Sequence, residues 1–590
     1  MCGIAGLVTR DGRPPDPGAL DTLAKALAHR GPDGQGRHVA GGTGLVQTRL
    51  AIIDLVTGDQ PIHEPGGAAL VGNGEVYNYL ELTADLPEVA FATRSDCEPP
   101  LHLWRQAGLA FATRLRGMYA LAVHDPKTDR LVLARDPFGI KPLYYAETAR
   151  GFAFASEPQA LLAAGLVERR EDTAKRDELL GLQFTTGAET IFQGITRLLP
   201  GETVAVERGR IVERRRLDAL PSDGPLGGDV ETLAYRLDEV LAESVGLHQR
   251  SDVPYGMFLS GGIDSSALLA LMARLNERPV LAFTAGFPGT QAADERAQGQ
   301  AVAQALGARH VEVAFTEQDF WTLLPQVAAA MDDPAADYAC LPTFKLAAEA
   351  RRHVKVILSG EGGDELFAGY GRYRAAMRPW PFSRPMRRRA IFDGLDLLRE
   401  PAAAWRQGIA TAERAEAKPG RSRLQIAQAV DCADWLPNDL LTKLDRCLMA
   451  HGVEGRVPFL DPAVAAFAFR LPDRLKVKGG LGKWLLRRWL DKVAPFADAY
   501  SRKRGFTVPV GEWIFTKAPV LGELVAAQPA IQALCRPGAV ERLFADRRHG
   551  FAAWTLLFYA LWHGRHILDR PVGDDVLETL EANREGACSI

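Results

Sequence analysis

The first 215 residues alternate short apolar runs with turn residues, as expected for strands that each bury one face. The runs that predict strands are residues 44–53, 68–71, 118–124, 130–135 and 152–155. Residues 20–28 and 100–107 have helical spacing of their apolar positions instead. The pattern predicts an α+β sandwich for this part of the chain.

Residues 220–228 are rich in proline and glycine and have no periodicity, which is typical of a linker. An amphipathic stretch at 230–247 follows, and strands then alternate with helices. The predicted strands are residues 253–259, 280–287, 310–313 and 354–359, and the predicted helices are 265–276, 295–306 and 320–330. This alternation indicates a parallel, doubly wound α/β sheet, and the chain is mostly helical from about residue 370. We expect domains at 1–215 and 230–590 with a linker at 216–229.

Composition narrows the function classes. A chain of 590 residues is too long for one core, and its net charge of −3 argues against a nucleic-acid partner. The chain has neither an apolar run of about 18 residues nor a basic segment followed by an apolar stretch at its start, so we expect no membrane helix and no signal peptide. Seven cysteines without CxxC spacing favour reduced thiols in the cytoplasm. The basic run at 387–389 is expected to be a solvated helix start.

Candidate chemistry begins at Cys2, which directly follows the initiator methionine. If Met1 is removed, Cys2 carries a thiol and a free α-amine whose pKa is near ~8 when unperturbed. The amine can then act as general base for its own thiol, and a thiolate is a far better nucleophile than a thiol. A cysteine near an N-terminus has no such meaning by itself, so this interpretation depends on the motifs that follow.

A glycine loop at residues 260–266 lies between an apolar strand and an apolar helix. Its glycines let backbone N–H groups approach a ligand, while Ser265 and Ser266 add hydroxyl donors at a helix N-terminus. This predicts an anion cradle at the carboxyl end of a strand. The GxxxxGK[ST] pattern of a P-loop is missing, so phosphoryl transfer of the usual P-loop kind is not indicated.

A second loop, residues 359–365, pairs glycines with three carboxylates after another apolar strand. Adjacent strands would bring Asp264 and Asp364 together beside one polyphosphate. Hard oxygen ligands combined with phosphate oxygens are what Mg²⁺ prefers. Two loops that serve one nucleotide are a better interpretation than two unrelated acidic turns.

Longer motifs connect these features. In the first domain they are MCGIAG (1–6), HRGPD (29–33), RLAIID (49–54), NGEVYN (73–78), SDCE (95–98) and DPFGIKPLYY (136–145). In the second they are residues 260–266 and 359–365, EGRVPFLD (454–461), Gly482-Lys483 and KRGF (503–506). In these motifs and their order the chain resembles glutamine-dependent asparagine synthetases, over nearly its whole length. The resemblance implies an N-terminal α+β sandwich of the Ntn type, with two antiparallel sheets and flanking helices, fused to an α/β synthetase domain of the ATP-pyrophosphatase type with a parallel doubly wound sheet and additional helices.

The resemblance also implies roles in the first domain. Cys2 would be the glutaminase nucleophile, and Asn73 with the Gly74 N–H would form its oxyanion hole, where fixed donors stabilise charge that develops on the carbonyl oxygen. Arg49 would bind the glutamine α-carboxylate through its planar fork, and Asp96 would bind the α-ammonium. The implied glutamine-binding residues are Arg49, Asn73, Glu75 and Asp96.

In the second domain the resemblance implies that Asp264 and Asp364 bind Mg²⁺ together with ATP. Glu361 would act near the acyl-adenylate and the incoming ammonia, and Lys483 would neutralise charge on the α-phosphate. Gly482-Lys483 alone is a short signature, so an exposed lysine at a helix start is the less favoured alternative for Lys483. The implied ATP-binding residues are Leu259, Ser260, Gly261, Gly262, Asp264, Ser265, Ser266, Ala285, Ser359 and Gly360.

Residues 332–342 depart from the family segment that contacts aspartate, which leaves the acceptor open. The other departures are Arg94, Cys97, Pro99, Pro100 and Gly455. We expect a ligase that hydrolyses glutamine to glutamate and ammonia, activates aspartate with ATP as an acyl-adenylate, and releases asparagine, AMP and pyrophosphate. One alternative is the same chemistry on another carboxylate, such as a peptide, an N-acyl dipeptide or a sugar acid.

Two further alternatives differ more. A cyclase like the β-lactam synthetases would abandon glutamine, which the intact motifs around Cys2, Arg49, Asn73 and Asp96 argue against. A regulator that keeps an inactive enzyme fold would not need complete motifs in both domains. The expected partners are small-molecule substrates, with neither nucleic acid nor membrane. Homodimers are common in the family, although no feature of the sequence establishes one.

Overall fold

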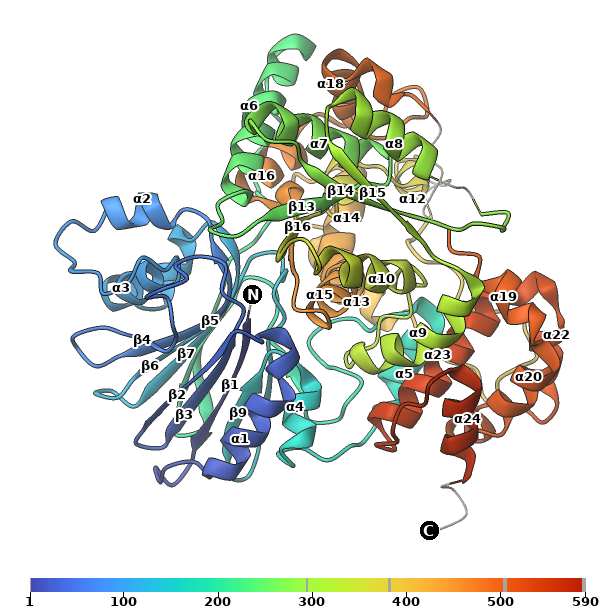
Figure 1. Cartoon of the computed structure of the whole chain (residues 1–590), viewed down its shortest axis with the longest axis horizontal. Coiled ribbons are helices and arrows are strands. Elements are labelled where there is room, and N and C mark those ends of the chain that lie inside the picture. The colour runs from blue at the N-terminus through green and yellow to red at the C-terminus, as the bar shows by residue number, and fades with distance from the viewer. Residues whose placement is uncertain (1, 293–294, 380–381, 383, 502–506, 586–590) are drawn as a thin grey trace.

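The computed structural model describes residues 2–292, 295–379, 382, 384–501 and 507–585. Two β-sheets built from the N-terminal part of the chain lie on one side of the molecule, and a third sheet lies among helices on the other (Figure 1). None of the helices in these described ranges is long and apolar enough to cross a membrane.

The first domain contains two six-stranded antiparallel sheets. One has the order β10-β8-β9-β1-β3-β2 and the other β12-β11-β7-β6-β5-β4. The first is formed by β1 (Cys2–Thr9), β2 (Gly34–Ala40), β3 (Thr43–Arg49), β8 (Tyr144–Glu147), β9 (Gly151–Ala155) and β10 (Thr196–Arg197). The second is formed by β4 (Ile62–His63), β5 (Ala69–Val76), β6 (Gly117–Asp125), β7 (Arg130–Arg135), β11 (Glu202–Glu207) and β12 (Arg210–Arg216). Buried Ile4, Leu45, Val71 and Leu133 come from both sheets and share one apolar core, so the predicted sandwich is confirmed.

Helices flank this sandwich. They are α1 (Pro17–Ala26), α2 (Tyr79–Ala84), α3 (Glu98–Ala107) and α4 (Pro158–Ala163), and the chain then continues into α5 (Thr173–Leu182). Helix α1 begins three residues before the predicted start because Asp16 caps it, accepting hydrogen bonds from the Gly18 and Ala19 N–H groups. Helix α5 lies beside the C-terminal helices (Figure 1), where Gln183 Nε2 donates to Thr555 Oγ1 at 3.1 Å.

The second domain contains a five-stranded parallel sheet of order β15-β14-β13-β16-β17. Its strands are β13 (Tyr255–Phe258), β14 (Leu281–Gly286), β15 (Arg309–Ala314), β16 (Val356–Leu358) and β17 (Glu454–Arg456). The doubly wound α/β prediction is confirmed. Strand β17 was missed because Glu454-Gly455-Arg456 contains no apolar run. The strand order reverses between β13 and β16, which is where open α/β sheets bind ligands.

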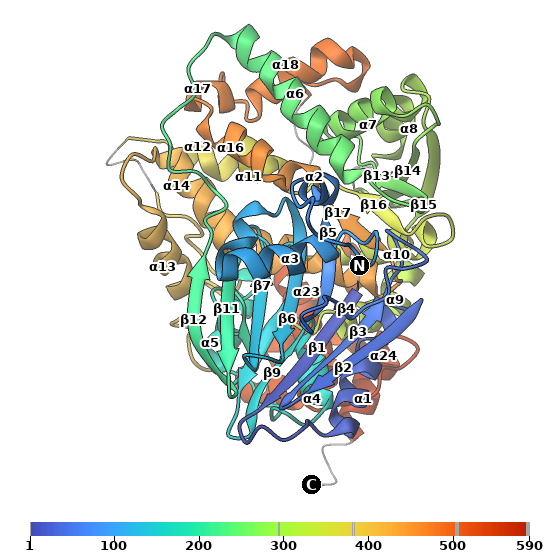
Figure 2. The same cartoon turned by 90° about the vertical axis from the view of Figure 1, so that its left-hand side faces the viewer.

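Helices cover both faces of the parallel sheet (Figures 1 and 2). The helices of this domain up to residue 493 are α6 (Val230–His248), α7 (Ile263–Leu275), α8 (Arg296–Ala305), α9 (Glu317–Ala330), α10 (Cys340–Ala350), α11 (Gly363–Phe367), α12 (Gly371–Ala376), α13 (Gln407–Glu416), α14 (Arg423–Val430), the π-helix η3 (Asp431–Leu441), α15 (Thr442–Met449), α16 (Pro462–Arg470), α17 (Asp473–Lys476) and α18 (Trp484–Val493). The C-terminal group is α19 (Val510–Thr516), α20 (Ala518–Ala526), α21 (Pro529–Leu534), α22 (Ala539–Ala545), α23 (Gly550–His566) and α24 (Val576–Glu585).

The basic run at 387–389 does not begin a helix, so that expectation was wrong. The Arg387 guanidinium carbon lies 4.9 Å from the Trp435 ring centroid and 5.5 Å from that of Phe184. A guanidinium can stack on aromatic faces while it keeps its charge, and here both rings come from distant parts of the chain. Burial also lowers the pKa of Arg387.

Buried ion pairs join the two domains. Arg197 of the first domain contacts Asp333 of the second at 2.5 Å, and Arg30 contacts Asp445 at 2.8 Å. All four side chains are buried. Breaking one partner of such a pair leaves a charge without compensation, so the pairs fix how the sandwich sits against the parallel sheet.

Candidate active site

Cys2 lies where the two sheets of the first domain meet. It begins β1 and is directly paired with Arg49 at the end of β3. Its backbone N–H donates to Asn73 Oδ1 at 3.2 Å, and Asn73 belongs to β5 of the other sheet. Burial raises the pKa of the Cys2 thiol above its ordinary value. A thiolate here therefore needs a base. The α-amine invoked from the sequence forms after loss of Met1, which lies outside the described residues.

Asn73 has an amide donor available beside Cys2. Its Nδ2 is buried and makes no hydrogen bond within the described part of the chain. Gly74 follows with φ +148°, and a Cβ at this position would meet the Met118 carbonyl oxygen at 2.0 Å. An L-residue cannot take that place without moving β6. The local backbone thus presents Asn73 and Gly74 together, as an oxyanion hole requires.

The other predicted glutamine-site residues are also buried in this region. Arg49 Nη1 contacts Asp59 at 2.6 Å, but the Asp59 side chain is 82% exposed and therefore gives way easily. Asp96 Oδ2 accepts a hydrogen bond from the Val76 N–H at 2.8 Å, and burial raises the Asp96 pKa to about 6. Burial also raises the pKa of Glu75, with further contributions from neighbouring carboxylates that include Asp96.

Two arginines at this site were not singled out from the sequence. Arg30 is fully buried, and its Nε donates to the Cys2 carbonyl at 3.2 Å. Arg456 Nη2 lies 3.5 Å from Glu75 Oε2 and comes from β17 of the second domain. Arg30 lies in the motif HRGPD and Arg456 in the motif EGRVPFLD, so their presence in these motifs could have identified them from the sequence. The second domain therefore contributes directly to the surroundings of Cys2.

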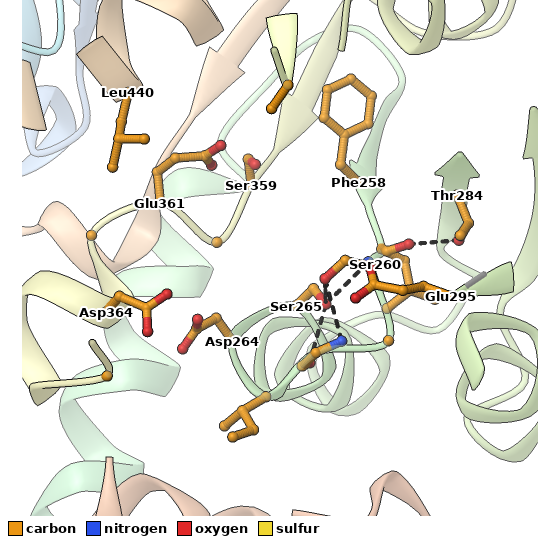
Figure 3. Close-up of a pocket in the computed structure, with 18 of the residues that line it drawn as sticks. Phe258, Ser260, Asp264, Ser265, Thr284, Glu295, Ser359, Glu361, Asp364 and Leu440 are labelled. Carbon is orange, nitrogen blue, oxygen red and sulfur yellow. Dashed lines mark hydrogen bonds between the residues drawn. The ribbon is translucent and has the colours of Figure 1, made fainter. Parts of the chain in front are cut away.

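The two glycine loops follow β13 and β16, which are neighbours in the parallel sheet. They line one cavity of about 400 Å³. Of the predicted ATP-binding residues, all except Ser266 line this cavity; Ser266 is fully buried instead. Phe283 and Thr284 of β14 add to the wall. Figure 3 shows the cavity running from Glu295 past the loops to Leu440.

Two serines of the first loop, residues 260–266, make hydrogen bonds within the loop. Ser260 Oγ and Ser265 Oγ are 3.1 Å apart, and the Gly262 N–H donates to Ser260 Oγ at 3.3 Å (Figure 3). Gly261 has φ +67°, in the left-handed region that favours glycine. The helix α7 begins directly after this turn, so its N-terminus and the serine hydroxyls face the same cavity.

Asp264 and Asp364 point toward each other across the cavity (Figure 3). Lys483 joins them: its Nζ contacts Asp264 Oδ2 and lies 2.6 Å from Asp364 Oδ1. Burial by itself would lower the pKa of Lys483, but the two carboxylates outweigh burial and raise it. Lys483 is 3% exposed, so it is not the exposed helix-start lysine that the short Gly482-Lys483 motif left open.

The donor set fits a magnesium ion carried in with a nucleotide. Asp264 and Asp364 supply the one or two carboxylates that Mg²⁺ takes when substrate phosphates complete its shell. Within the described residues no group of three or more His, Cys, Asp or Glu side chains could hold a metal by itself. Phosphate oxygens and water would therefore have to supply the remaining ligands.

The far end of the cavity carries one more charged pair. Lys443 on α15 lines it and contacts Asp337 at 2.8 Å. Glu361 also lines this end, and its Oε2 has no hydrogen-bond partner in the described ranges. Burial would lower the pKa of Lys443, but the Asp337 and Glu361 carboxylates raise it. Lys443 belongs to no quoted motif, and only its place after the π-helix η3 sets it apart, because π-helical segments are frequent at functional sites.

Residues 332–342 depart from the family pattern, and in the structure some of them lie at the domain interface and another lines the cavity. Asp332 accepts a hydrogen bond from the Gln159 N–H of the first domain at 3.0 Å, and Asp333 contacts Arg197, so both are used at the domain interface. Ala339 lines the cavity, as does Thr343 just beyond the segment. The motif residues 503–506 lie outside the described residues.

Comparison with known proteins agrees with this geometry. Residues 236–564 match the family model described as asparagine synthase, and residues 1–216 match that of a glutamine amidotransferase domain. The chain belongs to the asparagine synthase family. Asparagine synthetase (glutamine-hydrolyzing) 1 of Bacillus subtilis is 30% identical and covers 98% of each chain. A Mycobacterium tuberculosis protein that is provisionally named an asparagine synthetase (glutamine-hydrolyzing) is 35% identical. The match covers 95% of this chain and 97% of that protein.

Family membership confirms several predictions made from the sequence. This asparagine synthase family member is a glutamine-hydrolysing carbon–nitrogen ligase, with ATP as its co-substrate. Escherichia coli asparagine synthetase B (glutamine-hydrolyzing) is 28% identical, covering 90% of this chain and 86% of that protein. A Gibberella zeae relative named amidase chry2 is 29% identical, covering 83% and 75%. The family thus includes members with different names, and the acceptor has to be argued from the site.

Proposed function

We propose that the chain is a glutamine-dependent asparagine synthetase, which transfers the amide nitrogen of glutamine to the β-carboxylate of aspartate with cleavage of ATP to AMP and pyrophosphate. The observation that carries this proposal is the single cavity at the ends of β13 and β16. It combines two glycine loops, the Asp264–Lys483–Asp364 cluster and the unpaired Glu361 oxygen.

In the first half-reaction the Cys2 thiolate attacks the glutamine side-chain carbonyl. Asn73 Nδ2 and the Gly74 N–H stabilise the oxyanion, ammonia leaves, and water hydrolyses the thioester to glutamate. Arg49 binds the α-carboxylate and Asp96 the α-ammonium, with Glu75 in the same pocket. The unsatisfied Asn73 amide beside Cys2 supports this assignment.

In the second half-reaction an acceptor carboxylate oxygen attacks the α-phosphorus of ATP, and pyrophosphate leaves. Ammonia then attacks the acyl carbon of the adenylate, and AMP leaves as the amide forms. Residues of both glycine loops bind the phosphates, and Lys483 offsets the charge that builds on them. Glu361 stands beside the reacting carbonyl, where it can take a proton from the attacking ammonia.

Asp264 and Asp364 are the residues that would hold Mg²⁺. When bound with ATP, the ion would neutralise phosphate charge. Lys483 already bridges the same two carboxylates, so their mutual repulsion is compensated before any nucleotide arrives.

Lys443 is our proposed anchor for a second carboxylate of the acceptor. It is the cation at the Glu361 end of the cavity, and aspartate brings an α-carboxylate in addition to the one that reacts. The same anchor suits a peptide or a sugar acid that carries a free carboxylate. Ala339 and Thr343 also line the cavity, and neither carries a charge that would select the α-ammonium of aspartate. A peptide or sugar-acid acceptor is therefore the second candidate.

Product analysis tests the proposal. Purified protein is incubated with glutamine, MgATP and aspartate, and asparagine, AMP, pyrophosphate and glutamate are measured. We expect all four with the three substrates present, and no pyrophosphate without the acceptor. Glutamate release without aspartate-dependent pyrophosphate would reject aspartate and direct the search to peptide, N-acyl dipeptide and sugar-acid acceptors.

Glutamine use will fall in acid because of Asp96. Its pKa is raised by burial to about 6, so the carboxylate is ionised above that pH and neutral below it. The glutamine ammonium loses its partner as the pH falls, and kcat/KM for glutamine should drop about tenfold per unit below pH 6. Asp96→Asn should lower kcat/KM about 10- to 100-fold and remove this step. A wild-type profile that stays flat between pH 5 and 7, with the fold intact, would contradict the role.

Lys443→Met should raise the KM for the acceptor about tenfold or more and leave glutamine hydrolysis unchanged, because the anchoring cation is lost. Asp337→Asn is the matched variant, since it removes the partner of Lys443 but keeps the cation. If Asp337→Asn raises the acceptor KM as much as Lys443→Met does, Lys443 serves the ion pair and not the acceptor. Melting temperatures separate either effect from unfolding.

A further inference from the structure

A second cavity, of about 370 Å³, shares no lining residue with the nucleotide cavity. It lies between α1 and α4 of the first domain and the end of α23 of the second. Figure 1 shows α4 on the side of the sheets that faces the C-terminal helices. The cavity therefore opens at the junction of the two domains and not within either of them.

Its walls are positively charged. Lys25, Arg169 and Arg565 line it, and no aspartate or glutamate does. Asp569, just outside, contacts both Arg169 (3.1 Å) and Arg565 (3.2 Å) and is the acid shared between them. The Lys25 ammonium makes no hydrogen bond or ion pair with any described residue. Three cationic side chains thus line this space against one carboxylate.

The two arginines of this cavity affect each other electrostatically. Burial lowers the pKa of Arg169, and the neighbouring Arg565 lowers it further against the opposing effect of Asp569. Lys25 and Arg565 each lie in the last turn of a helix, where a cation is favoured by the helix dipole. That explains each residue separately, but it does not explain why cations from three segments face one cavity.

We propose that this cavity is a binding site for a small polyanion of the phosphate type. Two guanidinium groups and an ammonium that approach from different sides suit the several oxygens of a phosphate or pyrophosphate group, whereas a single planar carboxylate is satisfied by one arginine fork. The volume lies in the range of small-molecule pockets and exceeds what one phosphate fills, so a phosphorylated metabolite fits as well.

The wall of this polyanion cavity is connected to Cys2. His29 Nε2 lies 3.2 Å from Glu157 Oε1, and Gln159 Nε2 donates to Glu157 Oε2 at 2.7 Å. Glu157 in turn accepts a hydrogen bond from Arg30 at 2.6 Å, and Arg30 donates to the Cys2 carbonyl. A ligand that moves His29 or Gln159 therefore acts on Cys2 through three successive contacts, by way of Glu157 and Arg30. This consequence rests on the proposed function, whereas polyanion binding does not.

Calorimetric titration of the full chain with pyrophosphate, without Mg²⁺ and at low ionic strength, tests the site. We expect a binding event that Lys25→Glu weakens at least about tenfold and that added salt weakens in the wild type. Lys25 is exposed, so its reversal leaves the core packing intact. The matched control is Lys492→Glu, because Lys492 is also exposed and also lies in the last turn of a ten-residue helix.

A Lys25→Glu isotherm equal to that of the wild type, or an equal loss in Lys492→Glu, would overturn the proposal. Lys483→Ala separates the two cavities, since pyrophosphate is also a proposed product at the nucleotide site. The Lys25-dependent event must survive Lys483→Ala. If Lys483→Ala loses the Lys25-dependent binding event, the pyrophosphate binds in the nucleotide cavity. If Lys483→Ala loses only the ATP-dependent reaction, the proposed polyanion site is retained.

Discussion

Cys2→Ala will abolish glutamine-dependent amide synthesis and leave ammonia-dependent synthesis within about two- to threefold of the wild type. The loss with glutamine should be at least about 10³-fold, because the proposed thioester forms on the Cys2 sulfur and alanine has no nucleophilic atom there. Cys2 is buried between two sheets and contacts Asn73 through its backbone, so removing Sγ changes little of the packing. The measurement is amide product formed from saturating glutamine and, separately, from ammonium salts.

The matched control is Cys535→Ala, which removes another buried thiol far along the chain, on the C-terminal helices. It should retain both activities. If Cys2→Ala loses both nitrogen sources while its melting temperature is unchanged, the division of labour between the domains is wrong. If it keeps glutamine use, Cys2 is not the nucleophile.

The position of the nucleotide cavity could be predicted from the sequence. Glycine loops that follow apolar strands report on local structure, and parallel neighbours necessarily place such loops at one sheet edge. For this reason the side chains of Asp264 and Asp364 point toward each other across the cavity, as the sequence predicted. The family motifs then supplied Lys483, whose neighbourhood depends on Gly369: a Cβ there would lie 2.3 Å from Lys483 Cε.

Residues placed by long-range packing could not be found in the same way. Lys443 is one lysine in a helix whose polar residues are all buried, and only the structure reveals that it lies near Glu361. Arg387 looked like surface charge because the rings it stacks on, Phe184 and Trp435, are far away in sequence. The cations of the polyanion cavity come from three segments for the same reason.

Lys483→Ala will reduce acceptor-dependent pyrophosphate release about 10²- to 10³-fold while glutamine hydrolysis persists. Without the ammonium, Asp264 and Asp364 lose the cation that bridges them, and the departing phosphates lose the positive charge that Lys483 places between the two loops. Lys483→Arg should rescue little, because a longer, planar guanidinium cannot place one compact charge between the two carboxylates as the Lys483 ammonium does. Pyrophosphate release is followed with glutamine and with ammonia as nitrogen source.

Lys492→Ala on the same helix α18 is the control and should behave as wild type, since this lysine is exposed at the last turn. Asp364→Asn distinguishes two meanings of a loss at Lys483. If the cluster acts on the phosphates, Asp364→Asn also loses pyrophosphate release and keeps glutaminase activity. If Lys483 only relieved repulsion between the carboxylates, Asp364→Asn would restore activity to Lys483→Ala in the double variant. Restoration would remove Lys483 from the proposed chemistry and leave it a structural role.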